Sequence, residues 1–595
     1  MREFSVPALV EIRPDEALTD LVRDNARDHG DEIAFDRRTA TGWEQVTHAQ
    51  FETEVREVAR GLVALGVAPG DRVGLMCRTR YEWTLLDFAL WTAGAVVVPI
   101  YETSSPEQIL WMLTDSGARF CFVETPQHVK AVESVRPGLP AVAQVLRVDD
   151  LDRVREAGRT VPEAELDRIR AGITSDSLAT LIYTSGTTGR PKGCELTHAN
   201  FLFDAKNVIT GMREVFCVPG ASTLLFLPLA HVFARIIEVA CVYARVRIAH
   251  TPSTARLMLD LEALKPSFLL AVPRVFERVF NASRQKAEEA GKVRIFDAAA
   301  DAAIAYSEAM DRGGPGVLQR VKHAVFDRLV YAKLRTALGG RVTYAISGGA
   351  PLGERLGHFF RGIGVTVLEG YGLTETTAGT CINRPETLRV GTVGQPLPGV
   401  AVRIEEDGEV LIKGGNVFGG YWNDAASTAA VLDEDGWFRT GDLGSLDDGG
   451  FLRITGRKKE LIVTAGGKNV APAVLEDRLR AHPLVGQCVV VGDARPYITA
   501  LVTIDPEAFD YWKRTRDFDE ATTVADLVED DLLRREIKDG IDDANLAVSK
   551  AEGIKRFTIL PTDLTIESGH LTPKLSVRRA AVIEDFADEI EKLYH

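Results

Sequence analysis

Cysteine is scarce in this sequence, and its spacing is irregular. Seven cysteines are scattered over 595 residues, with no C-x-x-C pair and no paired histidine spacing. An odd, dispersed set of cysteines excludes a disulfide framework and a structural zinc site. We therefore expect reduced thiols and a cytoplasmic protein.

Long apolar runs are also missing. The longest, residues 88–101, is too short to span a bilayer and contains Pro99. The first residues, MREFSVPALVEIRPDE, carry acidic groups and no apolar core, which excludes a signal peptide. We expect no transmembrane segment, although the protein could make peripheral contact with a membrane to collect a lipid.

The third deficit is in positive charge. Lysine and arginine number 70 against 85 acidic residues, a formal net charge of −15. A general nucleic-acid binder needs a basic stripe to displace counterions, so this class is excluded. Sites for ATP or coenzyme A need only local donors and stay possible. With 45% hydrophobic residues, the chain can bury large cores and should hold more than one domain.

Short apolar runs alternate with helical patterns from residue 71 onward. This alternation predicts an α/β fold with layered, largely parallel sheets. The expected strands are 72–76, 95–100, 119–123, 179–183, 223–227, 267–272, 342–347 and 365–371, and the clearest expected helices are 81–91 and 105–113.

Three later stretches depart from this rhythm. Residues 281–340 are alanine-rich and charged, which predicts a helical insertion. Residues 389–457 hold Gly, Pro and short alternating segments, and they predict a small β-rich subdomain that closes a large N-terminal domain of residues 1–457. Residues 458–595 then predict a small, mobile α+β C-terminal domain, joined at the short polar hinge 457–460.

The chain is organised around residues 181–193, LIYTSGTTGRPKG. An apolar strand runs into a loop whose glycines let backbone N–H groups converge on an anion, while hydroxyls and an ammonium add donors. The loop therefore predicts a phosphate cradle, and its expected ligands are Thr184, Ser185, Gly186, Thr187, Thr188 and Lys192. Pro191 and Gly193 flank the lysine, unlike in a Walker A loop, whose lysine opens a helix. Thr197 is placed to cap the next helix.

Further motifs follow this loop. They read GGAPL (348–352), EGYGLTE (369–375), GWFRTGDLG (436–444), ITGRKKELI (454–462) and TAGGKNVAP (464–472). Together with the loop, they resemble the signatures of the adenylate-forming enzymes, which include acyl-CoA synthetases, peptide-synthetase adenylation domains and luciferases. The resemblance covers nearly the whole chain and points to bacterial long-chain fatty-acid–CoA ligases. Long-chain members also share the helical insertion and a segment like 272–277 beside the acyl tunnel.

The resemblance implies a nucleotide site. Tyr371 would stack on the adenine, Thr374 would bond the α-phosphate, and Asp442 would accept both ribose hydroxyls. Arg457 would be a second ribose or phosphate ligand. The implied adenine pocket consists of Gly349, Ala350, Pro351, Gly370, Tyr371 and Gly372. Gly466 and Gly467 would let the backbone lie against the pantetheine arm of coenzyme A.

Three implied roles have plainer alternatives. Glu375, with Thr184, would hold Mg²⁺, a hard cation that prefers oxygen ligands; alternatively Glu375 is a solvated acid that caps a helix. His231 would line the path of the acyl carboxylate, or it is a satisfied structural histidine. Lys459 would mark the pivot of the C-terminal domain, or it is an ordinary exposed lysine.

One departure concerns the lysine that drives adenylation in this family. Long-chain ligases usually read LTPTxKxKR near the end, whereas this chain reads LTPKLSVRR, residues 571–579. Ser576 occupies the ungapped position, and the nearest lysine is Lys574. In an extended segment, a shift of two residues keeps the same face but moves the side-chain root by about 6–7 Å. We expect Lys574 to take the role, the alternatives being a weakened first half-reaction or another lysine.

These observations predict an ATP-dependent long-chain fatty-acid–CoA ligase that uses Mg²⁺ and coenzyme A. Fatty acid and ATP would give acyl-adenylate and pyrophosphate, and coenzyme A would then displace AMP. Two rivals remain: a ligase that delivers its acyl group to a carrier-protein thiol, and a catalytically impaired nucleotide- or lipid-binding relative.

Overall fold

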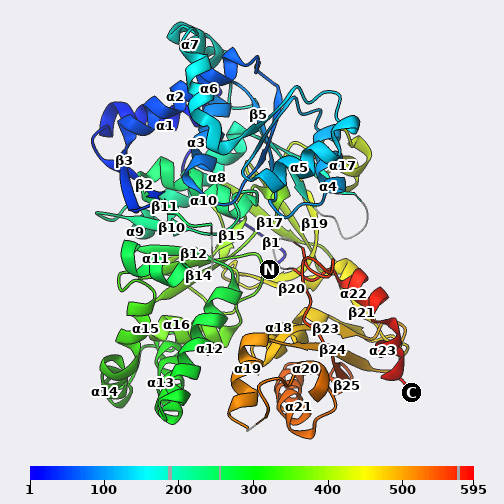
Figure 1. Ribbon diagram of the computed structural model, residues 1–595. Coiled ribbons are helices and arrows are strands. Elements are labelled where there is room, and N and C mark those ends of the chain that lie inside the picture. The colour runs from blue at the N-terminus through cyan, green and yellow to red at the C-terminus, as the bar shows by residue number, and fades with distance from the viewer. Residues whose placement is uncertain (185–189, 253–255, 517, 573–575) are drawn as a thin grey trace.

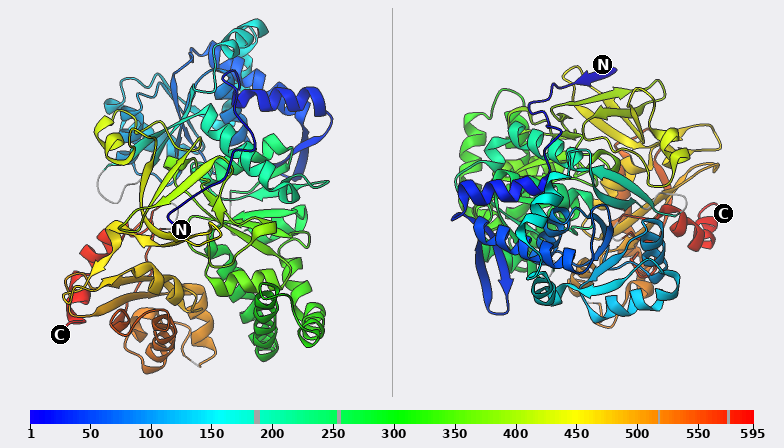
Figure 2. Two further views of the ribbon diagram at one scale, coloured as in Figure 1. Left: turned by 180° about the vertical axis from the view of Figure 1, so that it is seen from behind. Right: turned by 90° about the horizontal axis from the view of Figure 1, so that it is seen from above.

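The computed structural model describes residues 1–184, 190–252, 256–516, 518–572 and 576–595. A large upper part holds most of the N-terminal half (Figure 1). Below it lie two lobes side by side, one made of the helices of residues 273–337 and one of the C-terminal residues. The same arrangement is seen from behind in Figure 2.

A six-stranded sheet forms the centre of the upper part. Its strands in spatial order are β7 (Gln144–Arg147), β6 (Phe120–Val123), β4 (Arg72–Met76), β5 (Val96–Ile100), β8 (Leu178–Thr184) and β9 (Lys192–Thr197). The first five run parallel, and β9 returns antiparallel to β8. The apolar runs that predict these strands are nearly all buried, as strands covered on both faces require.

Two further sheets continue the α/β pattern. One is ordered β10 (Ser222–Leu225), β11 (Arg247–His250), β2 (Ile33–Thr39) and β3 (Gly42–Thr47). The other is ordered β12 (Phe268–Ala271), β13 (Tyr344–Ser347), β14 (Thr366–Tyr371), β15 (Cys381–Ile382) and β16 (Gln395–Pro396). The predicted α/β fold class is confirmed.

The stretch predicted to be β-rich forms an antiparallel sheet. Its order is β1 (Glu3–Ser5), β17 (Val400–Ile404), β18 (Glu409–Gly414), β19 (Phe438–Leu446) and β20 (Leu452–Arg457). The outer strand β1 comes from the first residues of the chain and pairs with β17 across almost 400 residues of sequence. No periodicity in three residues could have predicted this pairing.

Helices cover these sheets. In the N-terminal part they are α1 (Leu18–His29), α2 (His48–Ala64), α3 (Tyr81–Thr92), α4 (Pro106–Asp115), α5 (Pro126–Ser134), α6 (Leu151–Gly158), α7 (Glu163–Ala171), α8 (His198–Gly211), α9 (Arg213–Phe216), α10 (Val232–Ala244), α11 (Leu257–Leu264), α16 (Glu354–Gly362) and α17 (Ala425–Val431). Thr197 caps α8 as predicted: its hydroxyl accepts from the Asn200 N–H at 3.2 Å, and the Asn200 side chain accepts from the Thr197 N–H at 2.9 Å.

The helical lobe consists of α12 (Pro273–Glu289), α13 (Val293–Met310), α14 (Val317–Phe326), a π-helical turn (Asp327–Tyr331) and α15 (Ala332–Ala337). Helix begins at Pro273, eight residues before the expected start, because proline suits the first turn of a helix. The inner faces of these helices bury Phe276, Phe280, Phe296 and Tyr331 against Phe359 and Phe360 of α16.

The C-terminal lobe has its own hydrophobic clusters. Its strands are β21 (Ile462–Val463), β22 (Asn469–Val470), β23 (Val485–Val491), β24 (Ile498–Ile504) and β25 (Ile554–Ile559). Its helices are α18 (Pro472–Arg480), α19 (Pro506–Arg514), α20 (Val524–Leu527), α21 (Asp531–Asn545), α22 (Arg579–Asp585) and α23 (Ala587–Lys592). Arg274 of α12 contacts this lobe through Asp505, at 2.6 Å.

A buried ion pair joins three elements of the upper part. Arg235 of α10 donates to both carboxylate oxygens of Asp87 of α3, at 2.7 Å each, and to the Thr180 hydroxyl of β8, at 2.6 Å. Neither charged side chain is exposed. Such a pair keeps its place only while both partners are present, since a lone buried charge is strongly unfavourable.

We predict that Arg235→Met lowers the free energy of unfolding by about 3–5 kcal/mol, because the Asp87 carboxylate then loses its partner in a dry core. The matched control is Arg2→Met, whose pair with Glu406 is exposed on both sides and should cost less than about 1 kcal/mol. Urea unfolding measures both variants. Equal midpoints for the two would show that the buried pair does not anchor α10.

Candidate active site

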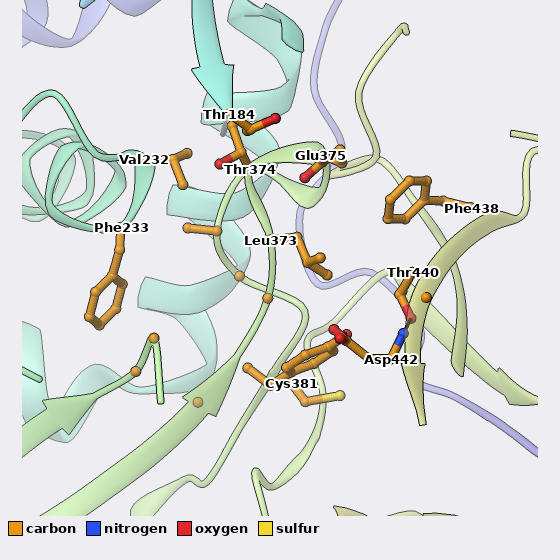
Figure 3. Close-up of a pocket in the computed structure, with 18 of the residues that line it drawn as sticks. Thr184, Val232, Phe233, Leu373, Thr374, Glu375, Cys381, Phe438, Thr440 and Asp442 are labelled. Atoms are coloured by element: carbon orange, nitrogen blue, oxygen red, sulfur yellow. Dashed lines mark hydrogen bonds between the residues drawn. The ribbon is translucent and has the colours of Figure 1, made fainter. Parts of the chain in front are cut away.

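A cavity of about 750 Å³ lies where β8, α10, β14 and β19 come together. Most of the predicted site residues line it, although they are spread over more than 270 positions of sequence. These are Thr184, Lys192, His231, Gly349, Gly370, Tyr371, Gly372, Thr374, Glu375, Asp442, Arg457 and Lys459. In the view of Figure 3, Thr184, Thr374 and Glu375 lie towards one end of the cavity and Asp442 towards the other.

The remaining predicted residues lie elsewhere. Ala350 and Pro351 follow Gly349 in an exposed loop and are not among the described lining residues. Gly466 and Gly467 lie between β21 and β22, exposed and away from the cavity. Ser185, Gly186, Thr187, Thr188 and Lys574 fall outside the described residues, so their placement stays a prediction.

Two contacts join the described residues that flank the stretch containing Lys574. Leu571 and Val577 pair as an antiparallel bridge, and the Thr572 N–H donates to the Ser576 carbonyl at 2.8 Å. The described residues on either side, Thr572 and Ser576, therefore lie next to each other. Lys574 itself lies outside the described residues, so the expectation that it takes the adenylation role stays a prediction.

The end of β8 and the start of β9 form one polar side of the cavity. Thr184 ends β8 and lies opposite Lys192, which begins β9. The ammonium of Lys192 donates to the Ser427 hydroxyl at 2.5 Å and lies 3.7 Å from the Asp424 carboxylate. This side therefore presents a cation and hydroxyl donors, the groups that bind phosphate oxygens.

A tight turn holds Thr374 and Glu375 in the cavity wall. A Cβ on Gly372 would lie 1.6 Å from the Ala378 carbonyl oxygen, so the turn can form only with glycine there. Thr377 and Ala378 have left-handed φ angles of 53° and 76°. Non-glycine residues in this region are strained, and such strain persists where surrounding contacts enforce it.

Glu375 is fixed by a side chain that the sequence did not single out. The Tyr421 phenol donates to the Glu375 carboxylate at 2.9 Å, and both residues line the cavity. Burial, and then the Glu375 carboxylate, raises the pKa of Tyr421 well above its ordinary value, so the phenol stays a donor. Glu375 is half-buried and held by Tyr421, which does not fit a freely solvated capping acid.

Asp442 is held between a phenol and a guanidinium. Tyr371 donates to one carboxylate oxygen at 2.6 Å, and Arg457 lies 3.1 Å from the other. Burial raises the pKa of Asp442 above its usual value, while Arg457 and Tyr371 limit that rise. The three residues thus form a fixed acceptor, suited to a pair of hydroxyl groups.

His231 caps helix α10. Its Nδ1 accepts from the Phe233 backbone N–H at 3.1 Å, and its ring lines the cavity. With Nδ1 as the acceptor, a neutral ring carries its proton on Nε2. His231 therefore has a structural role as a helix cap. Its position at the cavity also allows it to line the path of the acyl carboxylate.

The cavity also has an apolar side, which the sequence analysis missed. It is formed by Ala205 and Val208 of α8, Ile236, Ile237 and Ala240 of α10, and Leu397. On α10 these residues are spaced i, i+1 and i+4. Asp204, Ala205 and Val208 of α8 have the same spacing, which places residues on one face of a helix. That spacing was the available signal, but it equally fits a helix face buried in an ordinary core.

Asp204 is a buried acid on this apolar side. One carboxyl oxygen accepts from the Gly379 N–H at 3.0 Å, and the other has no described protein partner. Burial raises the pKa of Asp204 to about 8, only partly opposed by the Gly379 bond. The carboxyl is therefore protonated at neutral pH.

The donor set permits one kind of metal site. Among the described residues there is no cluster of three or more His, Cys, Asp or Glu side chains that could hold a metal ion alone. Mg²⁺ bound to nucleotides usually takes one or two carboxylates and otherwise water and phosphate oxygens. Glu375 and Thr184 line the same cavity, and this pair of oxygen ligands fits that mode.

Comparison with known proteins accounts for this arrangement. Residues 22–422 match the family model described as AMP-binding enzyme, and residues 459–595 match that of the AMP-binding enzyme C-terminal domain. The chain belongs to the AMP-binding enzyme family. It is 51% identical to the long-chain-fatty-acid–CoA ligase FadD15 of Mycobacterium bovis, over the full length of both chains.

More distant relatives extend the picture. The human long-chain-fatty-acid–CoA ligase ACSBG1 is 30% identical over 95% of this chain and 83% of its own length. Among solved structures, the A domain of carboxylic acid reductase from Segniliparus rugosus, bound to AMP and a co-purified carboxylic acid, matches with a TM-score of 0.75. That match covers 98% of this chain and 94% of the other at 21% identity, and it shows the shared AMP-binding enzyme fold.

We predict that Asp204 makes stability depend on pH. Its pKa is raised in the folded state, so its favourable contribution is complete below pH 4 and is lost as pH rises towards 8. Relative to Asp204→Asn, which keeps an acceptor for Gly379, the wild type should lose up to about 1.4 kcal/mol per pH unit between pH 5 and 8. The curve should flatten above pH 8.

Urea unfolding across this pH range measures the difference. Asp588→Asn, which removes an exposed carboxylate from α23, is the control and should give a difference that does not change between pH 5 and 9. A flat difference for Asp204→Asn as well would mean that the Asp204 carboxyl ionises at its ordinary pKa and is reached by solvent.

Proposed function

We propose that this AMP-binding enzyme is an ATP-dependent long-chain fatty-acid–CoA ligase. The observation that carries the proposal is one cavity with a polar, donor-rich side and an apolar side. The first suits a nucleotide and the second an acyl chain. The 51% identity over full length to a long-chain-fatty-acid–CoA ligase supports the same conclusion.

In the first half-reaction, an oxygen of the fatty-acid carboxylate attacks the α-phosphorus of ATP, and the bond to pyrophosphate breaks. Lys192, Thr184 and the 185–188 donors would hold the leaving phosphates. Thr374 would bond the α-phosphate, and Asp442, fixed by Tyr371 and Arg457, would accept the ribose hydroxyls. Preorganised donors of this kind stabilise the charge that develops as pyrophosphate leaves.

Magnesium would be held by Glu375 and Thr184. When bound, it would neutralise phosphate charge. The protein's own contribution is orientation, since the Tyr421 phenol fixes the carboxylate that faces the cavity. Outer hydrogen bonds to a ligating carboxylate commonly tune a metal site in this way.

In the second half-reaction, the sulfur of coenzyme A attacks the acyl carbonyl, its thiol proton is lost, and the bond to AMP breaks. We propose that residues 458–595 rotate about Lys459 as a mobile domain, bringing Gly466 and Gly467 to the pantetheine arm. In the present arrangement these glycines are away from the cavity, and the Arg274–Asp505 pair holds the C-terminal lobe against α12. Rotation must break that pair. Lys458 is bound to Glu409, whereas Lys459 is exposed at the cavity edge.

No helix of the described chain is long and apolar enough to cross a bilayer. We propose that the enzyme works in the cytoplasm and meets membranes by peripheral contact.

The deciding experiment compares wild type with Lys574→Ala, using palmitate, Mg·ATP and coenzyme A. Lys592→Ala, an exposed lysine of the same lobe, is the matched control. We expect palmitoyl-CoA from wild type and control. The Lys574→Ala variant should lose adenylate formation by about 100-fold or more, because it lacks the cation at the attacking carboxylate. It should still convert supplied palmitoyl-adenylate to the thioester.

Other outcomes would redirect the proposal. Normal adenylation by Lys574→Ala would show that another group performs the step. Adenylate formation without any thioester from free coenzyme A would indicate delivery to a carrier-protein thiol. If wild type formed no product at any chain length, the remaining interpretation would be a nucleotide- or lipid-binding relative that lacks catalysis.

A further inference from the structure

Helix α14 presents an unusual apolar stripe to solvent. Val317, Leu318, Val321, Val325 and Leu329 are 80%, 81%, 58%, 53% and 52% exposed. Four of them repeat every four residues, so they lie along one face of α14 and the turn that follows it. Single exposed apolar residues are ordinary on protein surfaces, but a contiguous row of this kind marks an interaction site.

The opposite face of the same helix is fully engaged. His323 stacks on Tyr306 with ring centroids 4.0 Å apart, and its Nε2 bonds the Gly362 carbonyl at 2.7 Å. Phe326 packs against Tyr331, which is buried in the core of the lobe. The helix is therefore held with its apolar stripe outward, and α14 lies at the outer end of the helical lobe (Figure 1).

Positive charge flanks the stripe. Arg320, Lys322, Arg328 and Lys333 are all exposed, and none forms an ion pair with a described residue. Residues 312–333 contain five basic residues and one acid, Asp327, which is already paired with Arg335. This local excess of positive charge stands against a net charge of −15 for the whole chain.

We propose that this face of α14 docks on the surface of an anionic lipid bilayer. A helix with an apolar stripe and lysines and arginines at its edges lies in the plane of a membrane interface, where the stripe enters the acyl boundary and the cations meet lipid phosphates. A second copy of this chain would bring the same positive charges together, so charge complementarity favours the lipid surface. If the enzyme has the proposed function, on which this point rests, the contact also places it at the lipid phase in which long-chain fatty acids dissolve.

The test is co-sedimentation of the full chain with vesicles, without ATP or fatty acid. Vesicles of phosphatidylcholine alone are compared with vesicles containing phosphatidylglycerol. Leu318→Gln/Val321→Gln removes two residues from the N-terminal part of the stripe and keeps helix propensity. The matched control, Leu9→Gln/Leu546→Gln, removes two apolar residues that are 54% and 76% exposed elsewhere.

We expect wild type and control to bind the anionic vesicles, and the α14 double variant to bind at least tenfold more weakly. Lys322→Glu/Lys333→Glu should weaken binding to the anionic vesicles by at least fivefold per lysine and remove their advantage over neutral ones. High salt should act in the same direction.

Three results would overturn the proposal: wild type that does not sediment with anionic vesicles, equal binding by the α14 variant, or a wild-type dimer that the α14 variant converts to monomer. The last would assign the face to a second copy. Because binding is measured without turnover, a failure of the ligase assay would leave this test intact. Conversely, both α14 variants should retain wild-type kcat with octanoate, a water-soluble acid.

Discussion

The carboxylate of Asp442 is the contact on which the site depends. It belongs to β19, its guanidinium partner Arg457 ends β20, and its phenol partner Tyr371 ends β14. Two sheets that share no strand are thus joined at one acid. A buried carboxylate is tolerated only when donors surround it, so the sheets must meet in this register for any of the three residues to be satisfied.

Helix α10 is fixed by contacts on several sides, and it forms part of the cavity wall. Its N-terminus is capped by His231, one of its faces contributes Ile236 and Ile237 to the apolar wall, and Arg235 on another face forms the buried pair with Asp87. The helix can therefore neither slide nor rotate without losing a cap, exposing the core or unpairing a charge. The apolar side of the cavity therefore depends on polar contacts that lie behind it.

Much of the fold could be predicted from the sequence, and the physical reason differs from one feature to another. Strands such as β4 and β5 were predictable because both faces are covered and their apolar runs are continuous. The site residues could be named as a set because their motifs resemble those of a known family, and most of them line one cavity. The early start of α12 and the pairing of β1 with β17 were not predictable, since three residues carry no periodicity and the first turn of a helix need not be amphipathic.

Tyr421 and Asp204 were missed for a different reason. Neither lies in a motif, and each matters because of what folding places beside it: Glu375 in one case and Gly379 in the other. Local sequence fixes the identity of a side chain but not its burial, and burial is what raises the pKa of the Asp204 carboxyl.

The net charge of the whole chain likewise does not describe the charge of a single local surface. A value of −15 argues against a general nucleic-acid binder, because such binding sums contacts over a whole surface. It says nothing about one helix, since screening confines exposed charges to a range of about 8–10 Å. Residues 312–333 are basic where the rest of the chain is acidic, and their apolar row was hidden in a stretch that composition described only as alanine-rich and charged. Only the folded structure shows which apolar side chains of a helix are exposed. That exposure distinguishes a helix packed in the core from a helix that offers a binding surface.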